Sequence, residues 1–373
     1  MELLYEVWLH TLSDFEPETA SKMAVLFDRD KRSFSSGEAD IRLLEDIGLS
    51  GEFAKRISEP EFFKKAKDII DYCKSNGIRI ITQESEEYPT ALKTITLPPR
   101  LLFAKGASLK PDNDVKVAVV GCRKPTEHGK SMARLIGRDL AKSGITVVSG
   151  MAEGIDGQAH AGALDSCGKT IAVLAGSVDV VYPSCHDRLY RQILENGGTI
   201  ISERPPRTPA KKYFYQQRNR IIIGLSQGAV IVEGKEASGT SITANLALQE
   251  NRDVFAVPGS PMLWQSELPN RMISEGAIIV NSADVPANYY RELNFELPDK
   301  APQKPTQNSS TGAAGEIEDE IMAYIRDNGG ILNIEQLLEA LDIELNVLSG
   351  RLTILCIKGK LRQESGNRYA LNE

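Results

Sequence analysis

The stretch that decides the fold is VKVAVVGCRKPTEHG (115–129), an apolar β-branched run that ends at a glycine and leads into a helical segment. Six more such runs end at a glycine or another turn residue. They are ITVVSG (145–150), TIAVLAG (170–176), TIISE (199–203), AVIVE (229–233), DVFAVPG (253–259) and AIIV (277–280). Nearly continuous Val, Ile and Ala is typical of strands covered on both faces. With helices expected at about 128–142, 156–167, 186–196, 215–226 and 241–250, the pattern predicts an α/β fold with a doubly wound, mostly parallel sheet.

Length and punctuation predict further domains around this sheet. A chain of 373 residues has room for two or three domains. Residues 1–85 look helical, and LLEDIGLSGEFAKRI (43–57) resembles a helix-hairpin-helix or SAM-like unit, although a plain helical cap fits equally well. The segment 291–315 is rich in proline and small polar residues and predicts a flexible linker. Three helical patterns and LRQESGNRYAL follow in 316–373, which suggests a winged helix, so the core spans 86–290.

Composition excludes several protein classes. The five cysteines form no CxxC pair, so we expect reduced thiols and neither a zinc site nor a disulfide framework. The first residues do not resemble a secretion signal, and no apolar run is long enough to span a membrane. We therefore expect a cytoplasmic protein with no membrane contact.

The net charge of −7 hides an uneven distribution along the chain. Residues 116–280 carry 19 basic and 15 acidic side chains, whereas both flanking segments are acidic. A local positive field can bind an anion whatever the charge of the whole protein. The middle of the chain is therefore where we look for a site.

The turn VVGCRKPTEHG (119–129) places Gly121 directly after a strand and before a helix start, whose free N–H groups favour an anion. Arg123 could clamp a phosphate there, or could pair with Glu127 as an ordinary surface arginine. The spacing matches neither a dinucleotide-binding fingerprint nor a P-loop.

Two later turns have a similar construction. SGMAEGIDGQAH (149–160) sets Asp156 and His160 four residues apart, and we favour an N-cap role for Asp156 over a metal or acid–base pair. EASGTSITANLA (236–247) places Ser238, Gly239 and Thr240 at a helix start. Because open α/β sheets bind ligands at the carboxyl ends of their strands, we expect these turns to converge.

The segment RPPRTPAKKYFYQQRNR (204–220) contains six basic side chains, no acid and three aromatic rings. Basic groups beside aromatic faces suit single-stranded nucleic acid, since the cations follow the phosphates and the rings stack on bases. Part of the segment could instead be structural, with its arginines paired to strand-end acids such as Glu203 or Glu233.

No catalytic motif emerges from the sequence. There is no GxSxG or HExxH, and Cys185 and His186 are adjacent, which disfavours a dyad. We expect no enzyme, no cofactor and no metal site. Two alternatives stay open: a phosphoribohydrolase-like enzyme acting on nucleotides through a carboxylate such as Glu233, and a nucleotide sensor or scaffold.

The motifs, in their order, resemble the DNA processing protein A family (DprA, also called Smf). The resemblance is carried by VAVVGCRKPTEHG (117–129), VVSGMAEGIDGQAHAGAL (147–164), TIAVLAGSVDVVYP (170–183) and the long stretch 217–259. It implies an extended Rossmann-like core, single-stranded DNA binding, a homodimer, and loading of the recombinase RecA onto DNA covered by single-strand-binding protein. That activity would serve natural transformation and homologous recombination.

The resemblance and the residue patterns together define the candidate DNA-binding residues. They are Gly121, Arg123, Lys124, Ser149, Gly150, Lys211, Lys212, Tyr215, Arg218, Asn219, Arg220, Ser238, Gly239 and Thr240. The chain departs from the family pattern at Cys122, at Tyr215-Gln216 and at Glu153, which replaces an arginine. The segment 316–373 is acidic, so we interpret it as a protein-interaction or regulatory module.

Overall fold

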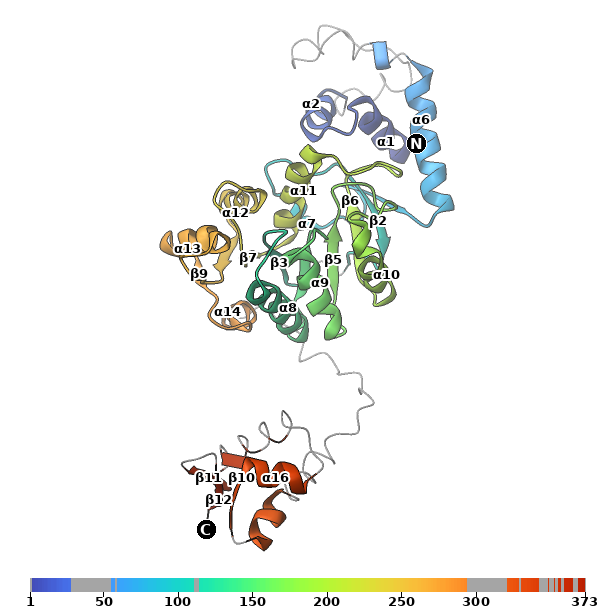
Figure 1. The fold of residues 1–373 in the computed structure, drawn as a ribbon. Coiled ribbons are helices and arrows are strands. Elements are labelled where there is room, and N and C mark those ends of the chain that lie inside the picture. Colours follow the sequence, from blue (N-terminus) through green and yellow to red (C-terminus); the bar gives the residue numbers. More distant parts are fainter. Residues whose placement is uncertain are drawn as a thin grey trace. The chain divides into compact units, whose positions relative to one another are not determined.

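The computed structural model describes residues 2–27, 55–57, 59–110, 114–293, 321–328, 330–341, 348, 352, 355–356, 359–364 and 368–372. The chain divides into two compact units, Met1–Gln303 and Lys304–Glu373 (Figure 1). This division falls inside the predicted linker 291–315. The helix-hairpin-helix prediction for 43–57 lies almost entirely outside the described residues.

In the first unit, nine described strands form one sheet in the order β1-β2-β6-β5-β4-β3-β7-β8-β9. The strands are β1 (Arg79–Thr82), β2 (Leu101–Gly106), β3 (Lys116–Val120), β4 (Thr146–Ser149), β5 (Thr170–Val173), β6 (Thr199–Ser202), β7 (Gly228–Ile231), β8 (Asp253–Ala256) and β9 (Ile278–Ile279). All pairs from β6 to β9 are parallel, while β1 and β2 add an antiparallel edge. Each of the seven predicted runs contains one strand, so the mostly parallel α/β prediction is confirmed.

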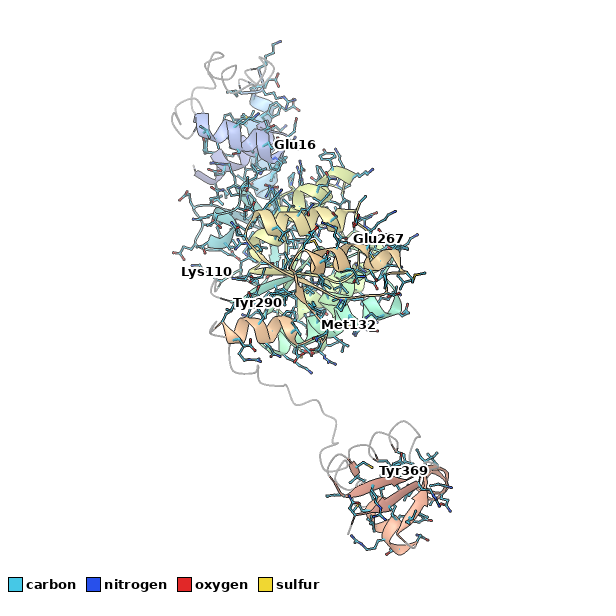
Figure 2. All side chains as sticks on the ribbon, turned by 90° about the vertical axis from the view of Figure 1, so that its left-hand side faces the viewer. Glu16, Lys110, Met132, Glu267, Tyr290 and Tyr369 are labelled. Carbon is cyan, nitrogen blue, oxygen red and sulfur yellow. The ribbon has the colours of Figure 1, made fainter. Side chains whose placement is uncertain are left out.

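Alternating side chains of β3 show why the sheet is covered on both faces. Val117 and Val119 belong to one hydrophobic cluster, and Ala118 and Val120 belong to another. Side chains along a strand alternate between its two faces, so a continuous apolar run requires helices on each side. Tyr290, labelled in Figure 2, is the largest fully buried side chain among the described residues and belongs to the hydrophobic cluster of Val117 and Val119.

Five helices of the sheet region lie close to their predicted positions. They are α8 (Glu127–Lys142), α9 (Ile155–Asp165), α10 (Asp187–Glu195), α11 (Lys212–Leu225) and α12 (Gly239–Gln249). Three further helices were not predicted, namely α7 (Thr90–Lys93), α13 (Glu267–Ser274) and α14 (Val285–Glu292). Helix α11 begins at Lys212, three residues before the expected start at 215. The extension brings Lys212 and Tyr215 into one helical turn.

The N-terminal helices share their core with the sheet. They are α1 (Glu2–Leu12), α2 (Pro17–Phe27) and α6 (Pro60–Ser75). Trp8 of α1 lies in one hydrophobic cluster with Phe103 of β2 and Leu174 after β5. A partly buried ion pair joins Glu6 to Arg100, with Oε1 and Nη2 2.8 Å apart. Residues 1–85 are therefore packed onto the core in the described part of the chain, and β1 within them is a strand of the main sheet.

The second unit contains a small antiparallel sheet in the order β10-β12-β11. Its described elements are β10 (Ile331–Asn333), α16 (Ile334–Ala340), β11 (Leu361–Glu364) and β12 (Arg368–Leu371). Asn333 and Gln336 form a capping box at the start of α16. The pairing of β11 with β12 confirms the predicted ribbon. The winged-helix assignment itself stays a prediction, because most of its proposed recognition segment, 343–355, lies outside the described residues.

Candidate functional site

The predicted turns converge where the strand order reverses. The chain leaves β3 toward β4 on one side and later returns to β7 on the other, so β3 and β7 flank the switch point of the sheet. Two cavities lie in this region, and the larger one has a volume of about 290 Å³. Its lining includes Gly121 and Arg123 after β3, Arg218 and Asn219 of α11, and Ser238, Gly239 and Thr240 at the start of α12.

A smaller cavity of about 60 Å³ adjoins the larger one, because both are lined by Arg123 and Tyr215. Its lining also includes Gly150 and Glu153 after β4, and Tyr182. These two cavities bring together most of the residues that the sequence singled out.

Arg123, Tyr182 and Tyr215 form a group that we call the aromatic rim. The guanidinium carbon of Arg123 lies 4.7 Å from the ring centroid of Tyr215. Tyr182 meets Tyr215 edge to face, with centroids 6.5 Å apart, and is 55% exposed. An exposed ring and a half-buried ring next to a guanidinium offer a stacking surface and a phosphate partner in one place.

Arg218 lies buried beneath this rim, with only 6% of its surface exposed. Its Nη1 donates to the Val173 carbonyl at 2.9 Å. Its Nε has no hydrogen-bond partner among the described residues. Burial lowers the pKa of Arg218, and the nearby carboxyl of Asp156 opposes that shift. The guanidinium therefore contributes a fixed positive charge to the wall of the larger cavity.

Asp156 is the counter-charge to Arg218 and does not cap α9. The N-cap position is Gly154, whose φ is +82°, a conformation that favours glycine. Asp156 instead accepts the Gly150 N–H at 3.1 Å. Burial raises the pKa of Asp156, whereas Arg218 and backbone N–H groups lower it. The N-cap prediction was thus off by two positions, and the carboxylate ties the β4 turn to α11.

His160 serves the core. Its Nδ1 lies 2.7 Å from Thr170 Oγ1, and its side chain is fully buried. Burial lowers the pKa of His160 to about 3. Among the described residues, no group of three or more His, Cys, Asp or Glu is arranged to hold a metal ion.

The start of α12 presents backbone donors to the larger cavity. The Ser238 hydroxyl donates to the Lys235 carbonyl at 2.6 Å and caps the helix. Gly239 is exposed, and a Cβ there would meet nothing within 4 Å. Free N–H groups and the helix dipole make such an end attractive to anions.

Glu233 holds the β3–α8 turn in place. It accepts the Thr126 N–H at 2.8 Å and the Thr126 hydroxyl at 2.5 Å. Gly129 packs against it so closely that a Cβ there would lie 2.3 Å from the carboxyl carbon. Burial raises the pKa of the neighbouring Cys122 thiol to about 11. The Glu233 carboxylate, which the alternative of a nucleotide-cleaving enzyme would need for catalysis, is therefore engaged in fixing the turn.

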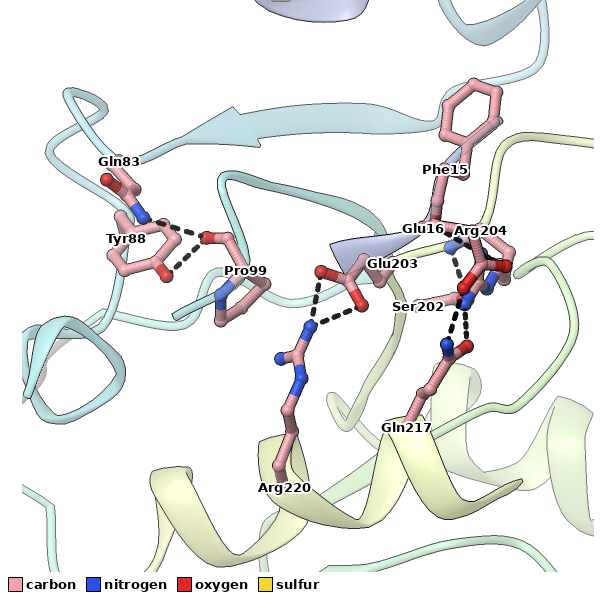
Figure 3. Close-up of polar contacts among 10 residues, drawn as sticks. All are labelled: Phe15, Glu16, Gln83, Tyr88, Pro99, Ser202, Glu203, Arg204, Gln217 and Arg220. Atoms are coloured by element: carbon pink, nitrogen blue, oxygen red, sulfur yellow. Dashed lines mark hydrogen bonds and ion pairs between the residues drawn. The ribbon is translucent and has the colours of Figure 1, made fainter. Parts of the chain in front are cut away.

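The basic segment 204–220 is divided between the site and the core. Arg220 donates from Nη2 to both oxygens of Glu203, each at 2.6 Å, and the pair is buried (Figure 3). Arg204 donates to the Phe15 carbonyl and to Gln217, so it joins the N-terminal helices to α11. Lys211 and Lys212 are exposed at the start of α11. The structural alternative thus holds for Arg204 and Arg220.

Two predicted DNA contacts, Arg220 and Ser149, therefore have structural partners. The Ser149 hydroxyl donates to the Val119 carbonyl at 2.6 Å and is fully buried. Neither residue lines the two cavities. Lys124 is exposed in the turn after β3, beside Arg123.

Sequence reasoning missed three residues that line the cavities. Tyr182 follows β5 in a loop without basic neighbours, and the available signal was the YP pair at 182–183. Lys235 and Trp264 line the larger cavity, and Trp264 is 43% exposed. Trp264 begins a short 3-10 helix, Trp264–Ser266, and the sequence around it gave no signal of a site.

Comparisons with known proteins match the region that contains this site. A family model described as DNA recombination-mediator protein A matches residues 79–290. The DNA processing protein DprA of Bacillus subtilis is 37% identical over 240 residues, which cover 64% of this chain and 78% of that protein.

Two solved structures are similar. The X-ray structure of DNA processing protein A from Streptococcus pneumoniae has a TM-score of 0.55 and 33% identity, and the match covers 69% of this chain and 91% of that one. The Helicobacter pylori protein, solved to explain its single-stranded DNA binding mode, has a TM-score of 0.52 and 29% identity, with 58% and 96% covered. No described helix is long and apolar enough to cross a membrane.

Proposed function

The chain belongs to the DNA recombination-mediator protein A family, and from this premise we propose that it binds single-stranded DNA without sequence preference and mediates recombination. The aromatic rim carries the proposal. The exposed Tyr182 ring, the Tyr215 ring and the Arg123 guanidinium together line the smaller cavity, and Tyr215 and Arg123 also line the larger one. Every base has a π-face that can stack on a ring, so this arrangement favours single-stranded DNA without favouring a particular sequence.

Phosphate binding would use the cations and helix ends around the rim. Arg123, Lys211 and Lys212 are exposed, and the start of α12 adds backbone donors. Arg218 supplies buried charge to the cavity wall. Because each neutralised phosphate releases counterions, we expect affinity to fall with rising salt.

We propose that the protein acts by binding and has no catalytic activity. Glu233, the carboxylate best placed by sequence, is engaged by Thr126. The buried Arg218 guanidinium and the start of α12 both line the larger cavity and would also suit the phosphate of a free nucleotide. A nucleotide sensor is therefore the second candidate function. Binding of mononucleotides but no affinity for oligonucleotides would favour that candidate.

The family also suggests the wider setting. We propose a cytoplasmic homodimer that loads RecA onto DNA covered by single-strand-binding protein during transformation and recombination. Addition of the purified protein to RecA and covered single strands, with RecA-dependent ATP hydrolysis as the readout, tests the loading step.

Fluorescence anisotropy of labelled oligo-dT and of a matched duplex, at two salt concentrations, tests DNA binding. We expect the wild type to prefer the single strand, with weaker binding at the higher salt. The variant Arg123→Ala with Lys212→Ala should lose most of that affinity, since it removes a rim cation and an exposed helix-start cation. Salt-independent binding, or equal binding by the variant, would reject the proposed site.

A further inference from the structure

A third groove lies between the N-terminal helices and the start of α11. Its volume is about 580 Å³, and it is lined by Lys65 and Ile69 of α6 and by Tyr213 of α11. Lys211, directly before α11, also lines it. This groove therefore starts at the helix end that carries Tyr215 of the aromatic rim, two residues after Tyr213.

The exposed side chains that line this groove include one aromatic ring, two cations and the carboxylate of Asp14. Tyr213 is 46% exposed, and its ring is supported from the side by Phe214, with centroids 4.5 Å apart and planes at 63°. Lys65 and Lys211 are exposed and form no ion pair with any described residue. The Lys211 ammonium also lies 5.7 Å from the centroid of the Phe214 ring. An exposed ring and cations in one groove are what single-stranded nucleic acid needs.

Two carboxylates line the same groove, and both have protein partners. Asp14 Oδ2 lies 2.6 Å from Nη1 of Arg56. Glu16 accepts from Gln217 Nε2 at 2.6 Å and lies 3.9 Å from the Arg204 guanidinium (Figure 3). Their negative charge is thus partly balanced within the protein, so it opposes an entering phosphate less than two free acids would.

Helix α6 is fixed to the loop that leads into α11. The Tyr72 hydroxyl donates to Asp179 Oδ2 at 3.0 Å. The same carboxylate accepts the Arg207 N–H at 2.9 Å, and the Arg207 guanidinium carbon lies 4.2 Å from the Tyr72 ring centroid. Lys65 is therefore presented by a helix that needs no ordering when a ligand binds.

We propose that this groove is a second single-stranded DNA subsite, which takes the nucleotides adjoining those at the aromatic rim. The strand would pass around the start of α11 at Lys211 and place a base on Tyr213 and a phosphate near Lys65. The inference rests on the proposed function, because it extends the same DNA path. The N-terminal helices would then contribute directly to the length of strand that is held.

Binding of oligo-dT of increasing length, from about 4 to 16 nucleotides, tests the proposal. We expect the wild type to gain affinity as the strand becomes long enough to fill both sites. The full-length variant Lys65→Gln with Tyr213→Ala should bind the shortest strands as the wild type does. For the longest strands it should bind about tenfold more weakly. Its salt slope should fall by about 0.7, the value for one phosphate contact on a single strand.

Lys67→Gln is the matched control, because Lys67 is exposed on the same helix but does not line the groove. Equal affinity of wild type and double variant at every length would overturn the second subsite and leave the proposed function intact. Equal weakening at every length would also overturn it, since the residues would then belong to the first site. If the wild type binds no oligonucleotide at all, the proposed function fails first and the inference fails with it.

Discussion

The guanidinium of Arg218 occupies the space where a side chain on Gly150 would stand. A Cβ on Gly150 would lie 1.5 Å from Nη1 of Arg218, far inside any permitted contact. The same nitrogen donates a hydrogen bond to the Val173 carbonyl. The Asp156 carboxylate accepts the Gly150 N–H. A buried cation therefore links α11 to two neighbouring strands, and the shape of the larger cavity depends on residue 150 being glycine.

Gly150→Ala should both destabilise the protein and weaken DNA binding. The added methyl group must displace Arg218, and overpacking of this kind costs about 1–3 kcal/mol. Urea unfolding gives the loss of unfolding free energy, and oligo-dT anisotropy gives the loss of affinity. Gly239→Ala is the control for stability, because a Cβ there meets nothing within 4 Å. Equal unfolding midpoints for the wild type and both variants would contradict this packing.

Arg220→Ala should lower stability far more than Arg123→Ala does. Removing Arg220 leaves the Glu203 carboxylate buried without its partner, which typically costs about 3–5 kcal/mol. Arg123 is exposed, so its loss should affect binding and barely affect unfolding. The double variant Arg220→Ala with Glu203→Ala should recover part of the loss. Additive effects of the two single changes in urea unfolding would show that the pair is not coupled.

The parallel part of the sheet was predictable because each strand is apolar on both faces and is punctuated by a turn. The antiparallel edge was not predicted. Strand β2 pairs with β6, whose residues lie about a hundred positions later, and no local signal reports such a pairing. The edge strand β1 was also not predicted, because it has only four residues and is mostly half-buried.

The site was predictable in its loops but less so in its side chains. The turns after β3, β4 and β7 converge as expected, because parallel strands end at one edge of the sheet. The roles of Arg220 and Ser149 depend on Glu203 and the Val119 carbonyl across the fold. Sequence spacing does not show which of several arginines a buried acid will hold. Tyr182 was missed because its value arises only from its position against Tyr215.

His10 should make the protein less stable in acid. Its imidazole is buried without a hydrogen-bond partner among the described residues, and burial, with Arg100, Arg204 and Arg220 nearby, lowers the pKa of His10 from 6.5 to about 3. Between these values the unfolded chain binds a proton that the folded chain does not. Stability is therefore fully present above pH 6.5 and falls as the pH drops toward 3.

His10→Leu removes the titratable imidazole and replaces it with an apolar side chain of similar size. The unfolding free energy of the variant, measured by urea titration from pH 8 to pH 4.5, should depend less steeply on pH than that of the wild type. The full contribution of one such proton is about 1.4 kcal/mol per pH unit. His160, also buried with its pKa lowered to about 3, should keep some acid sensitivity in the variant. Parallel curves for the wild type and His10→Leu would show that His10 has the same pKa in the folded and the unfolded chain, which would contradict the prediction.

Glu153→Gln should increase affinity for single-stranded DNA. Glu153 is exposed and lines the smaller cavity together with Arg123 and Tyr215, so its carboxylate lies where a phosphate would approach. Removing one repulsive charge near the protein surface is worth about 1 kcal/mol, or roughly fivefold in affinity at low salt. The gain should shrink as added salt screens the charge.

Glu195→Gln, an exposed change at the end of α10, changes the net charge equally and separates a local effect from a global one. If both variants improve oligo-dT anisotropy titrations by the same factor, Glu153 has no special position relative to the strand.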